Sequence, residues 1–128
     1  MTEPIIVVDS SEIREGTLDD VRQAMHDLAS FVEANVPRVL AYHMYLDEAR
    51  TRMTVVQVHA DSSSAEFHMK TSASMFRAFA ELIRLSTMDV YGKPSDELLE
   101  LLRQKVRLLG GATMTVHVLE AGFTRLSG

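Results

Sequence analysis

Two side chains capable of acid–base chemistry lie beside apolar segments of this sequence. Asp9 directly follows the β-branched run Ile5–Val8, and His68 lies in a predicted helical stretch that precedes Phe76. A histidine titrates near neutral pH and can accept a proton from a phenol. A partly buried carboxylate can act as a base or as a hydrogen-bond acceptor. His68 and Asp9 are therefore the candidate catalytic residues. The structural alternatives are a packed or solvent-facing helix histidine and a turn-forming aspartate at a strand end.

A second group of side chains has the composition of a ligand pocket. Aromatic residues can form the walls of a site for an aromatic compound, although at these spacings they also suit an ordinary core. Arginine can hold an anionic ligand group, or here pair with Glu81 one turn further on. The candidate pocket residues are Tyr42, Phe67, Phe76, Arg77 and Phe79.

Three histidines, His43, His59 and His117, fall on three different predicted strands. A three-histidine zinc site would form if their registers coincided, but nothing in their spacing requires this. The chain has no cysteine, no glycine-rich phosphate loop and no dinucleotide-binding fingerprint. We therefore predict neither a metal site nor a bound cofactor.

The composition is that of one globular domain over residues 1–128, with 46% hydrophobic residues and a net charge of −5. The acidic balance argues against a nucleic-acid partner, which requires a basic surface. No apolar run approaches the roughly 18 residues of a membrane span. The absence of cysteine and of a basic, apolar leader predicts a cytoplasmic protein.

The hydrophobic pattern predicts an α+β fold with a ferredoxin-like βαββα(α)β order. Apolar residues recur every three or four positions in the helices and at alternate positions in the strands. Such an order gives an antiparallel four-stranded sheet with its helices on one face. The expected elements are a strand at 5–8, a helix at 18–35, a hairpin at 39–60, a broken helical region from 61 to about 83, an extra helix at 95–109 and a last strand at 112–120.

The predicted strands carry apolar side chains on both alternations, which implies that both faces of the sheet are buried. Leu40, Tyr42 and Met44 lie on one side of the second strand, and Val39 and Ala41 lie on the other. The helices cover only one face, so we expect a homodimer formed through the face without helices.

Three segments give the chain a family resemblance. They are Arg14-Glu15-Gly16-Thr17, the hairpin at 39–60, and the stretch from Asp61 to Lys70 that leads to Phe76-Arg77-Ala78-Phe79. Together they resemble the antibiotic biosynthesis monooxygenase-like family of dimeric α+β barrels. The resemblance implies a pocket between helices and sheet in each subunit, and cofactor-independent oxidation of quinols or phenols.

The resemblance also bears on the candidate residues. Haem-degrading relatives carry an asparagine at the position of Asp9 and a tryptophan at that of His68, where many other members have histidine. Their haem-ligand histidine would fall near Phe79, where this chain has none, so haem binding is disfavoured.

The resulting hypothesis is a cofactor-independent monooxygenase acting on a small aromatic or quinol-like compound, with His68 or Asp9 as the base. The alternatives are a module that binds a small apolar or aromatic molecule without turnover, and a structural dimer whose cavity is filled by its own side chains. An open pocket containing His68 favours the first two.

Overall fold

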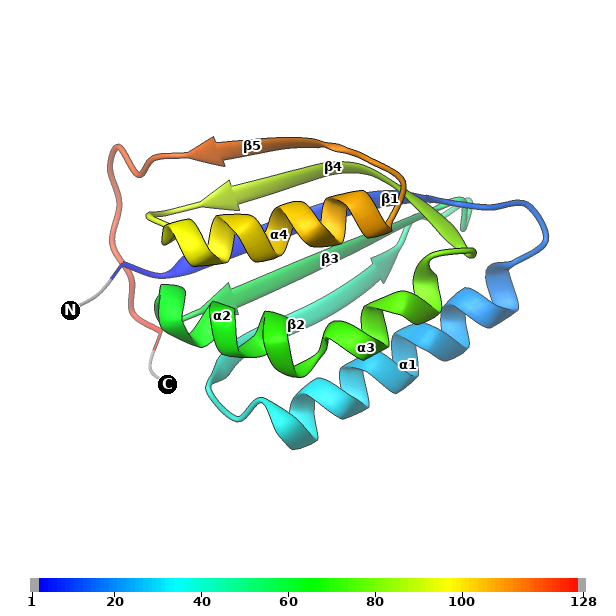
Figure 1. Ribbon diagram of the computed structural model, residues 1–128, viewed down its shortest axis with the longest axis horizontal. Coiled ribbons are helices and arrows are strands. Elements are labelled where there is room, and N and C mark those ends of the chain that lie inside the picture. The colour runs from blue at the N-terminus through cyan, green and yellow to red at the C-terminus, as the bar shows by residue number, and fades with distance from the viewer. Residues whose placement is uncertain (1–2, 127–128) are drawn as a thin grey trace.

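The computed structural model describes residues 3–126 and contains one five-stranded sheet covered on one face by helices (Figure 1). Within these residues, no helix is long and apolar enough to cross a membrane. The elements are β1 (Ile5–Ile13), α1 (Leu18–Asn35), β2 (Val39–Leu46), β3 (Arg52–His59), α2 (Ser62–Thr71), α3 (Ala73–Phe76), a 3-10 turn (Arg77–Phe79), β4 (Ile83–Tyr91), α4 (Asp96–Leu108) and β5 (Thr113–His117).

The strand order β2-β3-β1-β4-β5 confirms the ferredoxin-like arrangement. The first four strands pair antiparallel, and the β2–β3 hairpin forms as predicted. β5 pairs parallel with β4, because α4 carries the chain across the sheet before β5 begins. The sheet therefore has five strands where four were predicted, and α4 with β5 is an addition to the ferredoxin-like unit.

The prediction failed at β4. The apolar pattern indicated a helical region reaching about Ile83 and a short extended piece from Thr87 to Tyr91, whereas Ile83–Tyr91 is one nine-residue strand. Ser10 pairs with Thr87 and Ser11 with Leu85, so the strand bulges between these two pairs. A bulge adds one residue and shifts the alternation of buried side chains, which hides the strand period in the sequence.

In the sequence, Thr17 and Ser63 have the spacing of capping boxes with Asp20 and Glu66, and Ser95 is a typical N-cap residue. Thr17 precedes α1, but its hydroxyl donates to the carbonyl oxygens of Arg14 and Leu82 and does not cap the helix. α2 is capped by Asp61, whose carboxylate accepts the Ser64 N–H, and not by Ser63. The predicted cap of α4 is confirmed, since the Ser95 hydroxyl accepts the Leu98 N–H at 3.0 Å.

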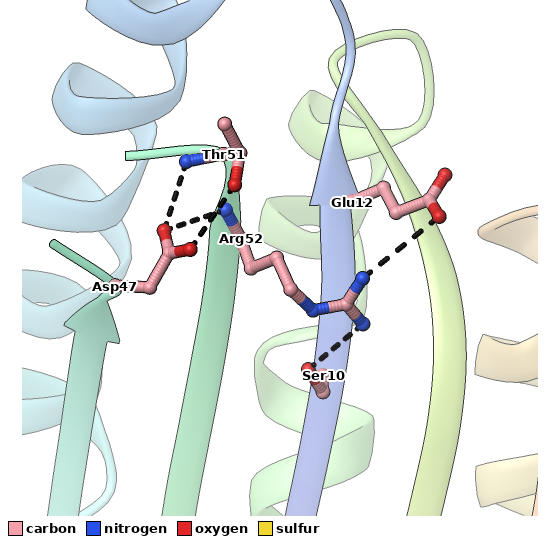
Figure 2. A network of polar contacts seen from close by, with 5 residues as sticks. All are labelled: Ser10, Glu12, Asp47, Thr51 and Arg52. Atoms are coloured by element: carbon pink, nitrogen blue, oxygen red, sulfur yellow. Dashed lines mark hydrogen bonds and ion pairs between the residues drawn. The ribbon is translucent and has the colours of Figure 1, made fainter. Parts of the chain in front are cut away.

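The β2–β3 turn is held by Asp47, as Figure 2 shows. Its carboxylate accepts hydrogen bonds from the N–H groups of Thr51 and Arg52 at 2.8 and 2.9 Å. These bonds, the one from Arg52 first, lower the pKa of Asp47. The Arg52 side chain then reaches β1, where it contacts Ser10 and Glu12. The turn thus fixes the register of the two strands that carry much of the site.

The core lies between the helices and the inner face of the sheet. The stripe predicted for α1 is confirmed, with Val21, Met25, Leu28 and Val32 all buried. On the opposite face, Ile6, Val8, Val56 and Val58 alternate with buried residues and remain partly accessible.

Candidate functional site

A cluster of polar side chains interrupts the apolar core between the sheet, α2 and α4. We call it the polar cluster, and its members come from strands, helices and the junction between α2 and α3. Most are less than 10% exposed, and Tyr42 is partly buried with a solvent-inaccessible hydroxyl oxygen. The cluster consists of Asp9, Tyr42, Gln57, His59, His68, Ser72 and Lys105.

The charged members of the cluster form a buried ion pair. The Nζ atom of Lys105, on α4, lies 3.2 Å from Oδ2 of Asp9, on β1, and the two side chains are 6% and 3% exposed. The same ammonium lies 4.4 Å from the centre of the Phe76 ring, which gives it a cation–π contact. From its sequence position Lys105 is explained by the last turn of a helix. It does lie in the last turn of α4, but its charge is also paired inside the core.

His68 lies at the centre of the cluster and is fully buried. Its ring is 5.1 Å from that of Tyr42, 5.4 Å from that of His59 and 5.8 Å from that of Phe76, centre to centre. Nδ1 of His68 is within 3.2 Å of the Ser72 hydroxyl one turn along the chain. Its Nε2 atom has no hydrogen-bond partner among the described residues.

Gln57 and His59 extend the cluster along β3. Oε1 of Gln57 can only accept a hydrogen bond, so the 2.9 Å contact requires the proton of His59 to be on Nε2. This leaves Nδ1 of His59 as a bare acceptor, and the Gln57 amide nitrogen is also unpaired within residues 3–126. With the Tyr42 hydroxyl and Nε2 of His68, four unpaired polar atoms therefore lie in one connected group. Buried polar groups almost always have a partner, so such a group fits a ligand or ordered water.

Burial keeps both histidines neutral. It lowers the pKa of His59 to about 4 and that of His68 to about 2, and the Lys105 charge acts in the same direction on both. At a pH below 6.5, the ordinary pKa of histidine, these two side chains are therefore protonated in the unfolded chain but not in the folded chain. Stability is thus complete above that pH and decreases as the pH falls toward 4. Burial, followed by the Asp9 charge, raises the pKa of Tyr42 well above its usual value.

Two hollows border the cluster at Lys105, but His68 lines neither of them. An inner cavity of about 10 Å³, lined by Asp9, Tyr42 and Lys105 among others, has room for about one water molecule. An outer groove of about 410 Å³ lies between the α2–α3 segment and α4. Phe76 and Lys105 line both, so these two side chains form the wall between them.

The structure brings several predicted residues together and separates others. Asp9, Tyr42, His68 and Phe76 meet in or beside the cluster, and Phe79 lines the inner cavity. Phe67 is 50% exposed and lies apart from the cluster, lining neither hollow. Arg77 is exposed and lines the outer groove, with no ion pair to Glu81 among the described residues.

The three strand histidines do not converge. His59 is buried on the inner face, His43 is exposed, and His117 contacts Asp89 at 2.9 Å on the outer side of the edge strands. Within residues 3–126, no three histidine, aspartate or glutamate side chains are arranged to hold a metal ion.

Several solved structures have a similar arrangement of helices and strands. MupZ from Pseudomonas fluorescens superposes with a TM-score of 0.73 at 18% identity, covering 98% of this chain and 91% of its own. A protein described as an antibiotic biosynthesis monooxygenase gives 0.60 at 15% identity, covering 71% of this chain and 99% of its own. This chain has the antibiotic biosynthesis monooxygenase-like fold.

A shorter solved structure covers about two thirds of the chain. A candidate antibiotic biosynthesis monooxygenase from Bacteroides thetaiotaomicron, at TM-score 0.59 and 12% identity, covers 66% of this chain and 84% of its own. No family model matches the sequence, and no curated protein matches it. At these identities the comparisons establish the fold, and the chemistry has to be argued from the polar cluster.

Proposed function

We propose that this chain is a cofactor-independent monooxygenase that oxidises an electron-rich aromatic hydroxyl compound at the polar cluster. The observation that supports it is the group of four unpaired polar atoms beside a buried ion pair in an apolar core. Several of its structural neighbours are named antibiotic biosynthesis monooxygenases, which agrees with this reaction class.

The groups have separate roles in this proposal. A neutral imidazole whose pKa is lowered to about 2 is a poor base for a phenol, whose pKa is about 10. His68 therefore offers a hydrogen bond from its unpaired Nε2 to the substrate oxygen. The Asp9 carboxylate takes the proton, because Lys105, its ion-pair partner, can then pair with the phenolate instead. The Lys105 ammonium, 3.2 Å from Asp9, stabilises the phenolate that forms.

The overall reaction needs no outside reductant. Substrate and dioxygen give a quinone and water: one oxygen atom enters a ring carbon as a carbonyl, and the other leaves with two substrate hydrogens. The substrate supplies all four electrons, so the protein has to supply a dry site, a proton acceptor and a cation.

A binding module without turnover is the second candidate. The inner cavity has room for about one water molecule, so an aromatic ring enters the cluster only if Phe76 and Lys105 move outward. If they do not move, a ligand stays in the outer groove and meets none of the four unpaired atoms.

The test is oxygen uptake with a trihydroxyanthracene, without added metal or flavin. The expected product is the corresponding anthraquinone carrying one labelled oxygen from ¹⁸O₂. Asp9→Asn and His68→Gln should each lower the rate by about 10²-fold or more, whereas His26→Gln, on the exposed face of α1, should not. A parent rate equal to the uncatalysed rate, across a panel of phenols and quinols, would favour the binding module.

The same proposal includes a homodimer. Ile6, Val8, Val56 and Val58 alternate along β1 and β3 with residues that are buried under the helices, so they lie on the opposite face of the sheet and remain partly accessible. Burying this face against a second copy removes the apolar surface from water.

A further inference from the structure

The outer groove has a composition that points to one class of ligand. It lies between the α2–α3 segment and α4 and has a volume of about 410 Å³, within the range of small-molecule sites. Its lining is Met69, Lys70, Ala73, Phe76, Arg77, Leu101, Gln104, Lys105 and Leu108.

The charged lining residues are all cations, in a chain whose net charge is −5. Lys70 pairs with Glu97, and Lys105 pairs with Asp9. Arg77 has no ion-pair partner among the described residues and is exposed at the groove. A guanidinium is matched in geometry to a carboxylate, with which it can form two parallel hydrogen bonds.

The remaining lining is largely apolar and partly open. Leu108 is 39% exposed, and Met69 and Phe76 contribute buried side chains to the same groove. A planar hydrocarbon body can cover these side chains while its charged end stays at Arg77. An inorganic anion or a small polar ligand would leave that apolar surface in water.

We infer that the outer groove binds an aromatic carboxylate, with Arg77 as the counter-ion and Met69, Phe76 and Leu108 against the ring. This inference rests on the proposed function and specifies its substrate class. Because Phe76 and Lys105 also line the inner cavity, a carboxylate held at Arg77 places the other end of the ligand at the wall of the polar cluster.

The experiment compares naphthoate with naphthamide, which has the same shape and no charge, by titration calorimetry at neutral pH and low salt. Naphthoate should bind about tenfold more tightly, because only it forms a charge-assisted pair with Arg77. Arg77→Gln should weaken naphthoate binding about tenfold and change naphthamide binding less than about twofold. Arg103→Gln is the matched control: Arg103 is an exposed α4 residue that pairs with Glu100 and does not line the groove.

Three results would overturn the inference. They are equal binding of the two probes, naphthoate binding that survives Arg77→Gln in full, and no binding of either probe at millimolar concentration. None of these measurements involves turnover, and naphthoate is not a quinol. Failure of the oxygen-uptake assay would therefore count against the monooxygenase proposal alone, and a failed titration would count against the groove alone.

Discussion

Breaking the Asp9–Lys105 pair should be far more costly than breaking a surface pair of the same length. At 3.2 Å, two unit charges attract by about 5 kcal/mol with an effective dielectric constant of about 20. Lys105→Met leaves the Asp9 carboxylate buried and unpaired, and we expect the free energy of unfolding to fall by about 3–5 kcal/mol.

The measurement is a double-mutant cycle in urea, with Lys105→Met, Asp9→Leu and the two combined. Because the combined variant removes both charges, it should be close to the parent in stability or above it, which gives a coupling energy of about 3 kcal/mol or more. If either single variant does not fold, the double variant still should.

The matched control is Arg107→Met on the same helix. Arg107 lies 3.2 Å from Glu100, but the two side chains are 63% and 53% exposed, so we expect a loss below about 1 kcal/mol. Two results would refute the reasoning: a Lys105→Met loss no larger than that of the control, or strictly additive single substitutions.

Three further predictions follow from the cluster and the sheet. Tyr42→Phe removes a hydroxyl with no partner in the described chain, so it should raise the free energy of unfolding by about 1 kcal/mol while lowering the oxidation rate. A loss of stability would show that the hydroxyl has a hydrogen-bond partner. Lowering the pH from about 7.5 to about 5 should reduce the free energy of unfolding by about 4 kcal/mol, because His59 and His68 are then protonated only in the unfolded chain. Urea melts should show that most of this loss disappears when both residues are replaced by glutamine, whereas His26→Gln should leave it unchanged. Light scattering should give a dimer at micromolar concentration that Val56→Asp dissociates; a parent monomer would contradict the proposed interface.

Local sequence patterns predicted most of the fold because they depend on nearby residues. The α1 stripe and the β2–β3 hairpin follow from periods of 3.6 and 2 that can be read directly. β4 escaped prediction because its bulge places Ile83 and Leu85 out of phase with Met88 and Val90, although all four are buried. A strand containing a bulge has no uniform period to detect.

Some members of the polar cluster were selected from the sequence. The member that was missed, Lys105, depends on a contact between distant parts of the chain. His68, Asp9, Tyr42 and Phe76 were selected for their chemistry, and the fold brings them together. Lys105 was missed because a lysine in the last turn of a helix already has a local explanation. Its partner is 96 residues away, so no local pattern connects the two.

Gln57 and His59 did leave a signal in the sequence. They continue the alternation of Met53 and Val55 on β3, and the register places them on the buried face of the sheet. Two polar residues at the inward positions of a strand indicate either partners or a site. The hydrogen bond between them satisfies only part of their capacity, which favours the site.

The arrangement of the unpaired atoms is the argument that the cluster has a function and is not a folding defect. Each unsatisfied buried polar group costs about 1–3 kcal/mol, so apolar residues at these positions would give a more stable core. Two further unpaired buried atoms, Oε1 of Glu3 and Oγ of Ser11, lie outside the cluster, but Tyr42, Gln57, His59 and His68 are in mutual contact or joined through their neighbours. Four of the unpaired atoms thus belong to one cluster, next to a buried ion pair and beside a cationic groove, which supports the proposal that the cluster receives a polar group from a ligand.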